Sequence, residues 1–248
     1  MKRGILLPAG GAKGAFQAGA IYGLNEQGIK FQVISGTSVG AVNGYCLYKN
    51  ALDAMKMIWM NMNEKTSEKI VKSDSKVRDN RQAIGILKAF ADASPTADKF
   101  FTNYIEVQGG RVQHKIDELG SKSAEEQLQG IKYSSLLPNI QSETGEEYMM
   151  KFMESVKKGE YDGFKLDGSL VHPVLWEPFI EERVDEIYCI TFSEELEIPE
   201  EILDCYTREQ IIIVSPQNEF QKGDTFNFSK EACRKRFEEG LNLFRQAK

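Results

Sequence analysis

The stretch GILLPAGGAKGAF (residues 4–16) runs from apolar residues directly into a glycine-rich turn. Its residues Ile5, Leu6 and Leu7 predict a buried first strand. The turn presents unpaired backbone N–H groups at the start of a helix, and such groups attract negative charge. That charge belongs either to the phosphates of a nucleotide or to the oxyanion of an acyl-transfer intermediate, and the rest of the sequence has to separate the two cases.

Predicted strands and helices alternate after this turn. A helical pattern covers residues 15–27 and stops at Gly28, KFQVIS (30–35) predicts a second short strand, and AVNGYCLYK (41–49) is typical of a helix. Strands that alternate with helices at this spacing indicate a parallel sheet with crossover helices. We therefore predict an α/β fold.

The same pattern returns near the end of the sequence. EIYCITFS (186–193) and EQIIIVSP (209–216) are short β-branched runs bounded by turn residues, which is typical of buried parallel strands. Ser229 is a good N-cap for a closing helix. Because no repeat or low-complexity tract interrupts the chain, we expect residues 1–248 to form one domain.

The middle of the chain is more polar. Residues 64–160 contain mostly helical runs such as RQAIGILKAFADA and EEYMMKFMESV, and we expect them to form a helical insertion in the α/β core. Residues 51–63 are rich in methionine, which adapts to irregular apolar shapes. This segment is either a pliable lid that faces lipid or an ordinary core helix, and the second is the more common arrangement.

Composition excludes several classes of protein. The net charge of −6 argues against a nucleic-acid partner, since such proteins normally carry a basic face. The 4 cysteines form no CxxC pair and show no ligand spacing with the 2 histidines, so we expect reduced thiols, no metal and no cofactor. The apolar run at the N-terminus is shorter than the ~7–15 residues of a signal-peptide core.

No stretch approaches the ~18 apolar residues of a membrane span. We therefore expect a cytoplasmic protein with no signal peptide and no transmembrane segment, whose contact with lipid is peripheral.

The motif that carries chemistry follows the second predicted strand. Residues 36–40 read GTSVG, a G-x-S-x-G in which Gly36 and Gly40 permit a sharp strand-to-helix turn around Ser38. Such a turn presents the serine hydroxyl as a nucleophile. The position of the motif between a β-run and a helix rich in small residues is the context that this chemistry requires.

The candidate serine nucleophile, together with two missing motifs, indicates which kind of negative charge the glycine turn binds. A phosphate-binding loop of the G-x-x-x-x-G-K-[ST] type has lysine after the glycine, whereas Lys13 precedes Gly14. Ala9 breaks the G-x-G-x-x-G pattern of dinucleotide-binding proteins. The turn is therefore best interpreted as an oxyanion hole formed by Gly10, Gly11, Ala12 and Lys13, in which backbone N–H groups stabilise the charge on the attacked carbonyl.

A serine nucleophile needs a group that accepts its proton, usually histidine. His172 follows Asp167 by five residues, about 16 Å of extended chain, and His114 lies in the polar middle region, so neither is well placed. The remaining candidates are two Asp-Gly turns, Asp162-Gly163 and Asp167-Gly168, and composition alone does not choose between them.

These motifs resemble the patatin-like phospholipase family. The similarity is strong over GILLPAGGAKGAFQAGAIYGLNEQGI and VISGTSVGAVNG, and clear in LDGSLVHPV, VDEIYCITFS and FNFSKEACRKRFEEGLNLF. The resemblance implies a three-layer α/β/α fold with a mostly parallel central sheet. It also implies a dyad without histidine, with Ser38 as nucleophile, Asp167 as proton acceptor, and Gly10, Gly11 and Ala12 as oxyanion donors.

The sequence departs from the family pattern at some positions. Lys13 stands where the family commonly has arginine, and Ala9 replaces the first glycine, so the loop has to avoid positive φ there. No clear small-Ser-x-x-x-Pro segment is recognised before Asp167.

The sequence therefore predicts a serine acyl hydrolase that cleaves lipid esters, of the phospholipase A, lysophospholipase or esterase type, through Ser38 and Asp167. Two alternatives stay open. One is a histidine-dependent α/β-hydrolase, which the chain order Ser38, Asp167, His172 permits, and the other is an inactive lipid-binding module. No motif specifies the headgroup, the acyl position or the oligomeric state.

Overall fold

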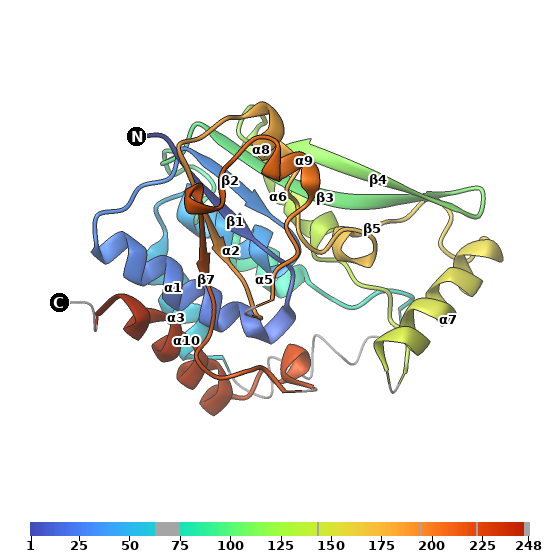
Figure 1. Ribbon diagram of the computed structural model, residues 1–248. Helices are drawn as coiled ribbons and strands as arrows, with labels where there is room; N and C mark the ends of the chain where they lie inside the picture. Colours follow the sequence, from blue (N-terminus) through green and yellow to red (C-terminus); the bar gives the residue numbers. More distant parts are fainter. Residues whose placement is uncertain (63–74, 143, 194, 222, 246–248) are drawn as a thin grey trace.

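The computed structural model describes residues 1–62, 75–142, 144–193, 195–221 and 223–245 (Figure 1). These residues form a seven-stranded sheet with the order β4-β3-β2-β1-β6-β7, in which β5 also pairs with β3. The strands are β1 (Arg3–Leu7), β2 (Val33–Gly36), β3 (Lys99–Gln108), β4 (Arg111–Glu118), β5 (Lys165–Asp167), β6 (Glu186–Ile190) and β7 (Ile211–Val214). All pairs are parallel except those that β4 and β5 make with β3, so the predicted parallel sheet is confirmed.

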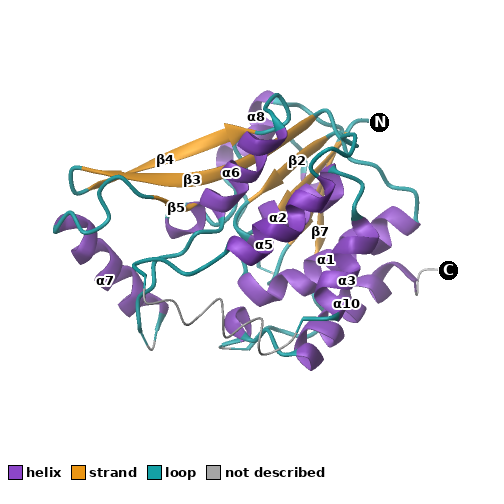
Figure 2. Ribbon diagram, turned by 180° about the vertical axis from the view of Figure 1, so that it is seen from behind, coloured by secondary structure: helices purple, strands orange, loops and turns teal. Residues whose placement is uncertain are grey.

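Helices cover both faces of this sheet. The larger layer contains α1 (Gly14–Glu26), α2 (Val39–Tyr48), α3 (Leu52–Met60), α5 (Arg81–Leu87), α6 (Ala124–Ser134) and α10 (Lys230–Arg245), and Figure 2 shows α2, α5 and α6 in front of the strands. The short helices α8 (Pro178–Glu181) and α9 (Glu200–Leu203) cover the opposite face. None of the helices in the described part of the chain is long and apolar enough to cross a membrane.

The alternation of side chains along β1 explains the three layers. Ile5 and Leu7 pack into the cluster formed with α1, α2, α3 and α10, whereas Leu6 packs into a second cluster with Phe179 and Ile202. Successive side chains of a strand point to opposite faces, so a strand buried on both faces is a continuous apolar run. The predicted three-layer α/β/α fold is confirmed.

The structure corrects the prediction of a helical insertion over 64–160. Residues 99–118 form the hairpin of β3 and β4, and β3 is a full member of the sheet next to β2. The prediction was wrong there because polar residues occur throughout the hairpin: β3 buries Thr102 and Asn103 in its centre, and every residue of β4 is at least partly exposed, so the region looks polar overall. Helices α6 and α7 (Gly145–Lys157) are helical as expected, and residues 64–74 lie outside the described residues.

The methionine-rich segment 51–63 is mainly a core helix. Leu52, Met55 and Trp59 of α3 are buried in the cluster with α1 and α10, while Met57 is 63% exposed. Residue 63 lies outside the described residues.

Helices α1 and α10 approach each other closely at two glycines. A Cβ atom on Gly19 would lie 2.0 Å from the carbonyl oxygen of Phe237, and one on Gly240 would lie 2.2 Å from the carbonyl oxygen of Phe16. Both obstacles are backbone atoms, which cannot rotate away. The absence of side chains at these two positions therefore sets the distance between the first and last helices.

We predict that Gly240→Ala lowers the free energy of unfolding by about 1–3 kcal/mol, because the added methyl group overpacks this contact. Gly85→Ala is the matched control, since the space around Gly85 in α5 is open. Alanine favours a helix interior over glycine by about 0.5–1 kcal/mol, so the control should stabilise. Urea unfolding measures both; equal effects of the two substitutions would contradict the close approach.

Candidate active site

Ser38 lies at the turn between β2 and α2, as the G-x-S-x-G motif predicts. Its backbone has φ 56° and ψ −121°, a strained conformation for a residue other than glycine. The two glycines of the motif allow the backbone to pack closely. A Cβ atom on Gly40 would lie 1.9 Å from the carbonyl oxygen of Leu7, and a Cβ atom on Gly36 would lie 2.6 Å from the carbonyl oxygen of Gly40. The turn is therefore pressed against the end of β1.

Asp167 is the carboxylate that meets the serine. The Ser38 hydroxyl donates a hydrogen bond of 2.6 Å to Asp167 Oδ2, and the Ser169 N–H donates to Oδ1 at 2.8 Å. Asp162, the other candidate, is exposed and accepts a hydrogen bond of 3.0 Å from the Gly110 N–H in a surface turn. Of the two Asp-Gly turns, only the second brings its carboxylate to Ser38.

Strand β3 brings these two residues together. It pairs with β2 so that Thr102 lies opposite Gly36, and it pairs with β5 so that Tyr104 lies opposite Asp167. Positions 102 and 104 are two residues apart on one strand. A region that was not predicted to be a strand therefore aligns the serine turn with the carboxylate.

The environment of Asp167 changes its acidity. The side chain is fully buried, and this desolvation raises its pKa from the ordinary value of 3.8 to about 6. Hydrogen bonds from Ser38 and Ser169 stabilise the charged form and oppose the shift. Asp167 is thus a stronger base than an exposed aspartate and is still ionised at neutral pH.

Two further buried hydroxyl groups hold the serine turn. The Ser38 N–H donates to Ser134 Oγ at 2.9 Å, Ser134 Oγ lies 2.9 Å from Thr102 Oγ1, and Thr102 Oγ1 lies 2.7 Å from the Gly36 carbonyl oxygen. Sequence reasoning missed Thr102 because β3 was not recognised, and it missed Ser134 because this residue reaches the serine turn from the end of α6, 96 residues along the chain. Ser134 stands four residues before Pro138, a spacing that could have suggested it.

The glycine turn begins with a short 3₁₀ helix over Gly11–Lys13. Gly11 has φ 56°, and a Cβ there would lie 2.3 Å from the Thr225 carbonyl oxygen, so only glycine fits. Ala9 avoids positive φ, as expected. Within the described residues, the N–H groups of Gly10, Gly11 and Ala12 have no acceptor.

Lys13, the last residue of the predicted oxyanion hole, has no free backbone N–H group. Its N–H already donates to the Gly10 carbonyl oxygen at 3.2 Å. Its ammonium group lies over the rings of Phe192 and Phe220, 5.0 and 5.6 Å from their centroids, and burial lowers its pKa. The set of available oxyanion donors is therefore narrower than the sequence predicted.

A buried amide network fixes the glycine turn to α2 and α3. Asn43 Nδ2 donates to the Gly14 carbonyl oxygen at 2.9 Å and to Gln17 Oε1 at 3.0 Å, while Trp59 Nε1 donates to Asn43 Oδ1 at 3.0 Å. Gln17 Nε2 in turn donates to the Pro8 carbonyl oxygen at 3.3 Å. The network holds both ends of the turn against the helix that follows Ser38.

Ser38, 9% exposed, opens into a cavity of about 430 Å³. Gly10 and Gly11 line the same cavity, whereas Ala12 does not. Most of the remaining wall is apolar and includes Val42, Met55, Ile58, Trp59, Leu137 and Phe228. A hydroxyl group that is bonded to a buried carboxylate and shares an apolar cavity with free N–H donors is suited to acyl transfer from an apolar acyl group.

The rings of the two histidines contact each other. Their rings stack with centroids 4.2 Å apart, and His114 Nε2 lies 3.1 Å from Asn103 Nδ2. Among the described residues, neither imidazole makes a hydrogen bond to Ser38 or to Asp167, and neither lines the cavity. This agrees with the sequence-based expectation for both residues.

The fold and the site together define a class: α/β proteins with a serine on a strained strand-to-helix turn beside a glycine-rich loop. The family model for patatin-like phospholipases matches residues 5–139, more than half of the chain. The chain therefore belongs to the patatin-like phospholipase family, a family of lipid-hydrolysing enzymes. The match includes the glycine turn, the serine turn and β3.

Individual relatives agree with this assignment. The chain is 46% identical over 54 residues to lysophospholipase nte1 of Aspergillus terreus. This alignment covers 22% of the chain and 4% of the fungal protein. The structure is similar to VipD from Legionella pneumophila, with a TM-score of 0.54 at 12% identity over 99% of this chain and 66% of that one. The type III effector protein ExoU gives a TM-score of 0.50 at 13% identity, over 98% and 52% of the two chains. The chain spans less than two thirds of each of these proteins, and the structural likenesses establish the fold alone.

We predict that Asp167→Asn stabilises the protein above pH 6. Because folding raises the pKa of this carboxyl, its contribution to stability is full below about pH 3.8 and is lost as the pH rises through about 6. A shift from 3.8 to about 6 corresponds to at most about 3 kcal/mol, which a neutral amide would recover at pH 8.

Chemical unfolding at pH 4 and pH 8 measures this effect. Asp162→Asn is the control, since that side chain is exposed and should show no comparable gain at pH 8. A destabilised Asp167→Asn protein at pH 8 would contradict the account of the buried carboxylate.

Proposed function

We propose that this protein hydrolyses lipid esters through a dyad of Ser38 and Asp167. Ser38 Oγ attacks the ester carbonyl carbon while its proton passes to Asp167, and the alkoxide that leaves takes that proton. Water then attacks the acyl-serine ester, regenerates the serine hydroxyl and releases the fatty acid. The observation that carries the proposal is the 2.6 Å hydrogen bond from Ser38 Oγ to a fully buried carboxylate.

The oxyanion of the tetrahedral intermediate is assigned to the glycine turn. The free N–H groups of Gly10 and Gly11 support this role, because both residues line the cavity that contains Ser38. Each such donor commonly stabilises the transition state by about 3–4 kcal/mol. Ala12 has a free N–H but does not line the cavity, and the Lys13 N–H is already bonded, so Gly10 and Gly11 are the preferred donors.

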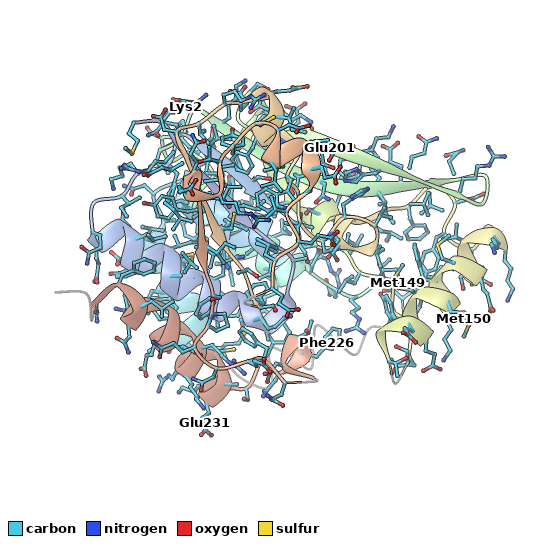
Figure 3. The ribbon with its side chains drawn as sticks, in the orientation of Figure 1. Lys2, Met149, Met150, Glu201, Phe226 and Glu231 are labelled. Atoms are coloured by element: carbon cyan, nitrogen blue, oxygen red, sulfur yellow. The ribbon has the colours of Figure 1, made fainter. Side chains whose placement is uncertain are left out.

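The substrate is an ester with an apolar acyl chain. The apolar wall of the cavity and the similarity to a fungal lysophospholipase support this assignment. Phe226 lines the cavity and is 52% exposed, and Figure 3 places it on the lower side of the molecule, away from Lys2, which precedes β1. We propose that this side contacts lipid peripherally, and that the protein is cytoplasmic, in keeping with its free cysteines.

Ser38→Ala should reduce hydrolysis of a p-nitrophenyl acyl ester by about 10⁴-fold or more, because it removes the hydroxyl group that donates its hydrogen bond to the Asp167 carboxylate. Asp167→Asn should cost about 10³–10⁴-fold, and Asp162→Asn should cost little. Covalent labelling by a fluorophosphonate, measured alongside, should occur in the wild type and disappear in Ser38→Ala. A wild type that neither labels nor hydrolyses would instead indicate a lipid-binding module.

The pH dependence tests the base. If Asp167 accepts the proton, kcat/KM should rise through an apparent pKa near 6 and reach a plateau above it. Histidine also titrates in this range, so the profile is repeated on the double variant His114→Ala, His172→Ala. The variant should keep the midpoint and a kcat within a few-fold of wild type. Loss of activity or of the titration in a folded double variant would replace the dyad by a histidine triad.

A further inference from the structure

The cavity that contains Ser38 is also lined by Arg78. The guanidinium group lies over the ring of Phe226, 4.7 Å from its centroid, and Nε is buried with no hydrogen-bond partner in the described part of the chain. A buried N–H without an acceptor costs free energy unless a ligand supplies one. No side-chain hydrogen bond of Arg78 is formed within the described residues, so its guanidinium group offers N–H donors to whatever enters the cavity that it lines.

The neighbouring carboxylate does not neutralise this charge. Arg81 donates from Nε to Asp79 Oδ1 at 2.9 Å and from Nη2 to Asp79 Oδ2 at 2.7 Å. These bonds hold the pKa of Asp79 at about 2. Both oxygens of Asp79 thus face Arg81, and no ion pair to Arg78 is formed within the described residues.

The position of Arg78 is fixed relative to the serine. The backbone N–H of Arg78 donates to the Leu137 carbonyl oxygen at 2.8 Å, and Val77 forms a β-bridge with Pro138. The segment 134–138 also carries Ser134, which accepts the hydrogen bond from the Ser38 N–H. One segment therefore supports both the cation and the nucleophile.

The other positively charged side chain on the cavity wall is Lys13, and its contacts differ from those of Arg78. The Lys13 ammonium group lies over the rings of Phe192 and Phe220, and burial lowers its pKa. Arginine is always charged and presents a planar fork of N–H groups that matches two phosphate oxygens, and stacking on an aromatic ring leaves the edge of the fork available. Arg78 is thus the better group for an anion.

We propose that Arg78 binds the phosphate of the substrate headgroup and makes the protein prefer acyl esters that carry a phosphate over neutral acylglycerols. The inference rests on the proposed function and adds to it a residue that determines specificity. The phosphate lies at Arg78 while the acyl ester reaches Ser38 in the same cavity.

The test compares palmitoyl lysophosphatidylcholine with monopalmitoylglycerol, presented in the same micelles of neutral detergent. Arg78→Gln should lower the ratio of kcat/KM for the phospholipid to kcat/KM for the acylglycerol by about 10- to 100-fold, the worth of hydrogen bonds to a charged group. Arg78→Lys should give an intermediate ratio. Arg208→Gln removes an exposed positive charge outside the cavity wall and should leave the ratio at the wild-type value.

Each outcome decides the proposal. Neutral fluorophosphonate labelling at the wild-type rate shows that Arg78→Gln is folded, and Arg78→Lys replaces it if it is not. Equal losses on both substrates, or an unchanged ratio, would overturn the role of Arg78 while leaving the proposed function intact. A third outcome is that Arg78→Gln leaves the ratio unchanged, while inorganic phosphate inhibits acylglycerol hydrolysis by the wild type but not by Arg78→Gln. That result would assign the site to a free anion. A wild type that cleaves neither substrate would overturn the proposed function, and this inference with it.

Discussion

The hydrogen bond between Ser38 and the buried Asp167 carboxylate is the interaction on which the rest of the site depends. A carboxylate without solvent is unfavourable unless its oxygens accept hydrogen bonds, and here one accepts from the Ser38 hydroxyl and the other from the Ser169 N–H. Each oxygen therefore needs its donor at a fixed place. The precision of the fold around Asp167 follows from this electrostatic requirement.

Strand β3 meets that requirement through its register. It holds Thr102 opposite Gly36 and Tyr104 opposite Asp167, so the serine turn and the carboxylate share one rigid support. The positive φ of Ser38 is a strained state that persists only where surrounding contacts enforce it. Those contacts are the buried hydroxyl of Ser134 on one side and the close approach of Gly40 to β1 on the other. The backbone strain and the buried charge are thus held by the same few elements.

The sequence predicts the parts of this design that are local. The glycine turn, the serine turn and the parallel strands β1, β2, β6 and β7 each have a short pattern and lie where the pattern indicates, although β7 is an edge strand with Ile213 40% exposed and is not fully buried as predicted. Strands β3 and β4 have no such apolar run, because β3 has the polar residues Thr102 and Asn103 in its buried centre and every residue of β4 is at least partly exposed. Ser134 and Thr102 act through contacts between segments distant in sequence, and the choice between Asp162 and Asp167 also depended on tertiary pairing. The same holds for Lys13, whose expected role was limited by one backbone hydrogen bond.

Exclusion of water links substrate binding to the proposed chemistry. An apolar wall favours an acyl chain because burial of that chain releases water from both surfaces. Asp167 is itself fully buried, and this desolvation raises its pKa and makes it a better proton acceptor for the serine hydroxyl. The basicity of Asp167 is therefore set by the fold before a substrate arrives, and the ester carbonyl meets a serine whose proton acceptor is already in place. Under the proposed mechanism, a dyad without histidine works because the protein itself desolvates its base.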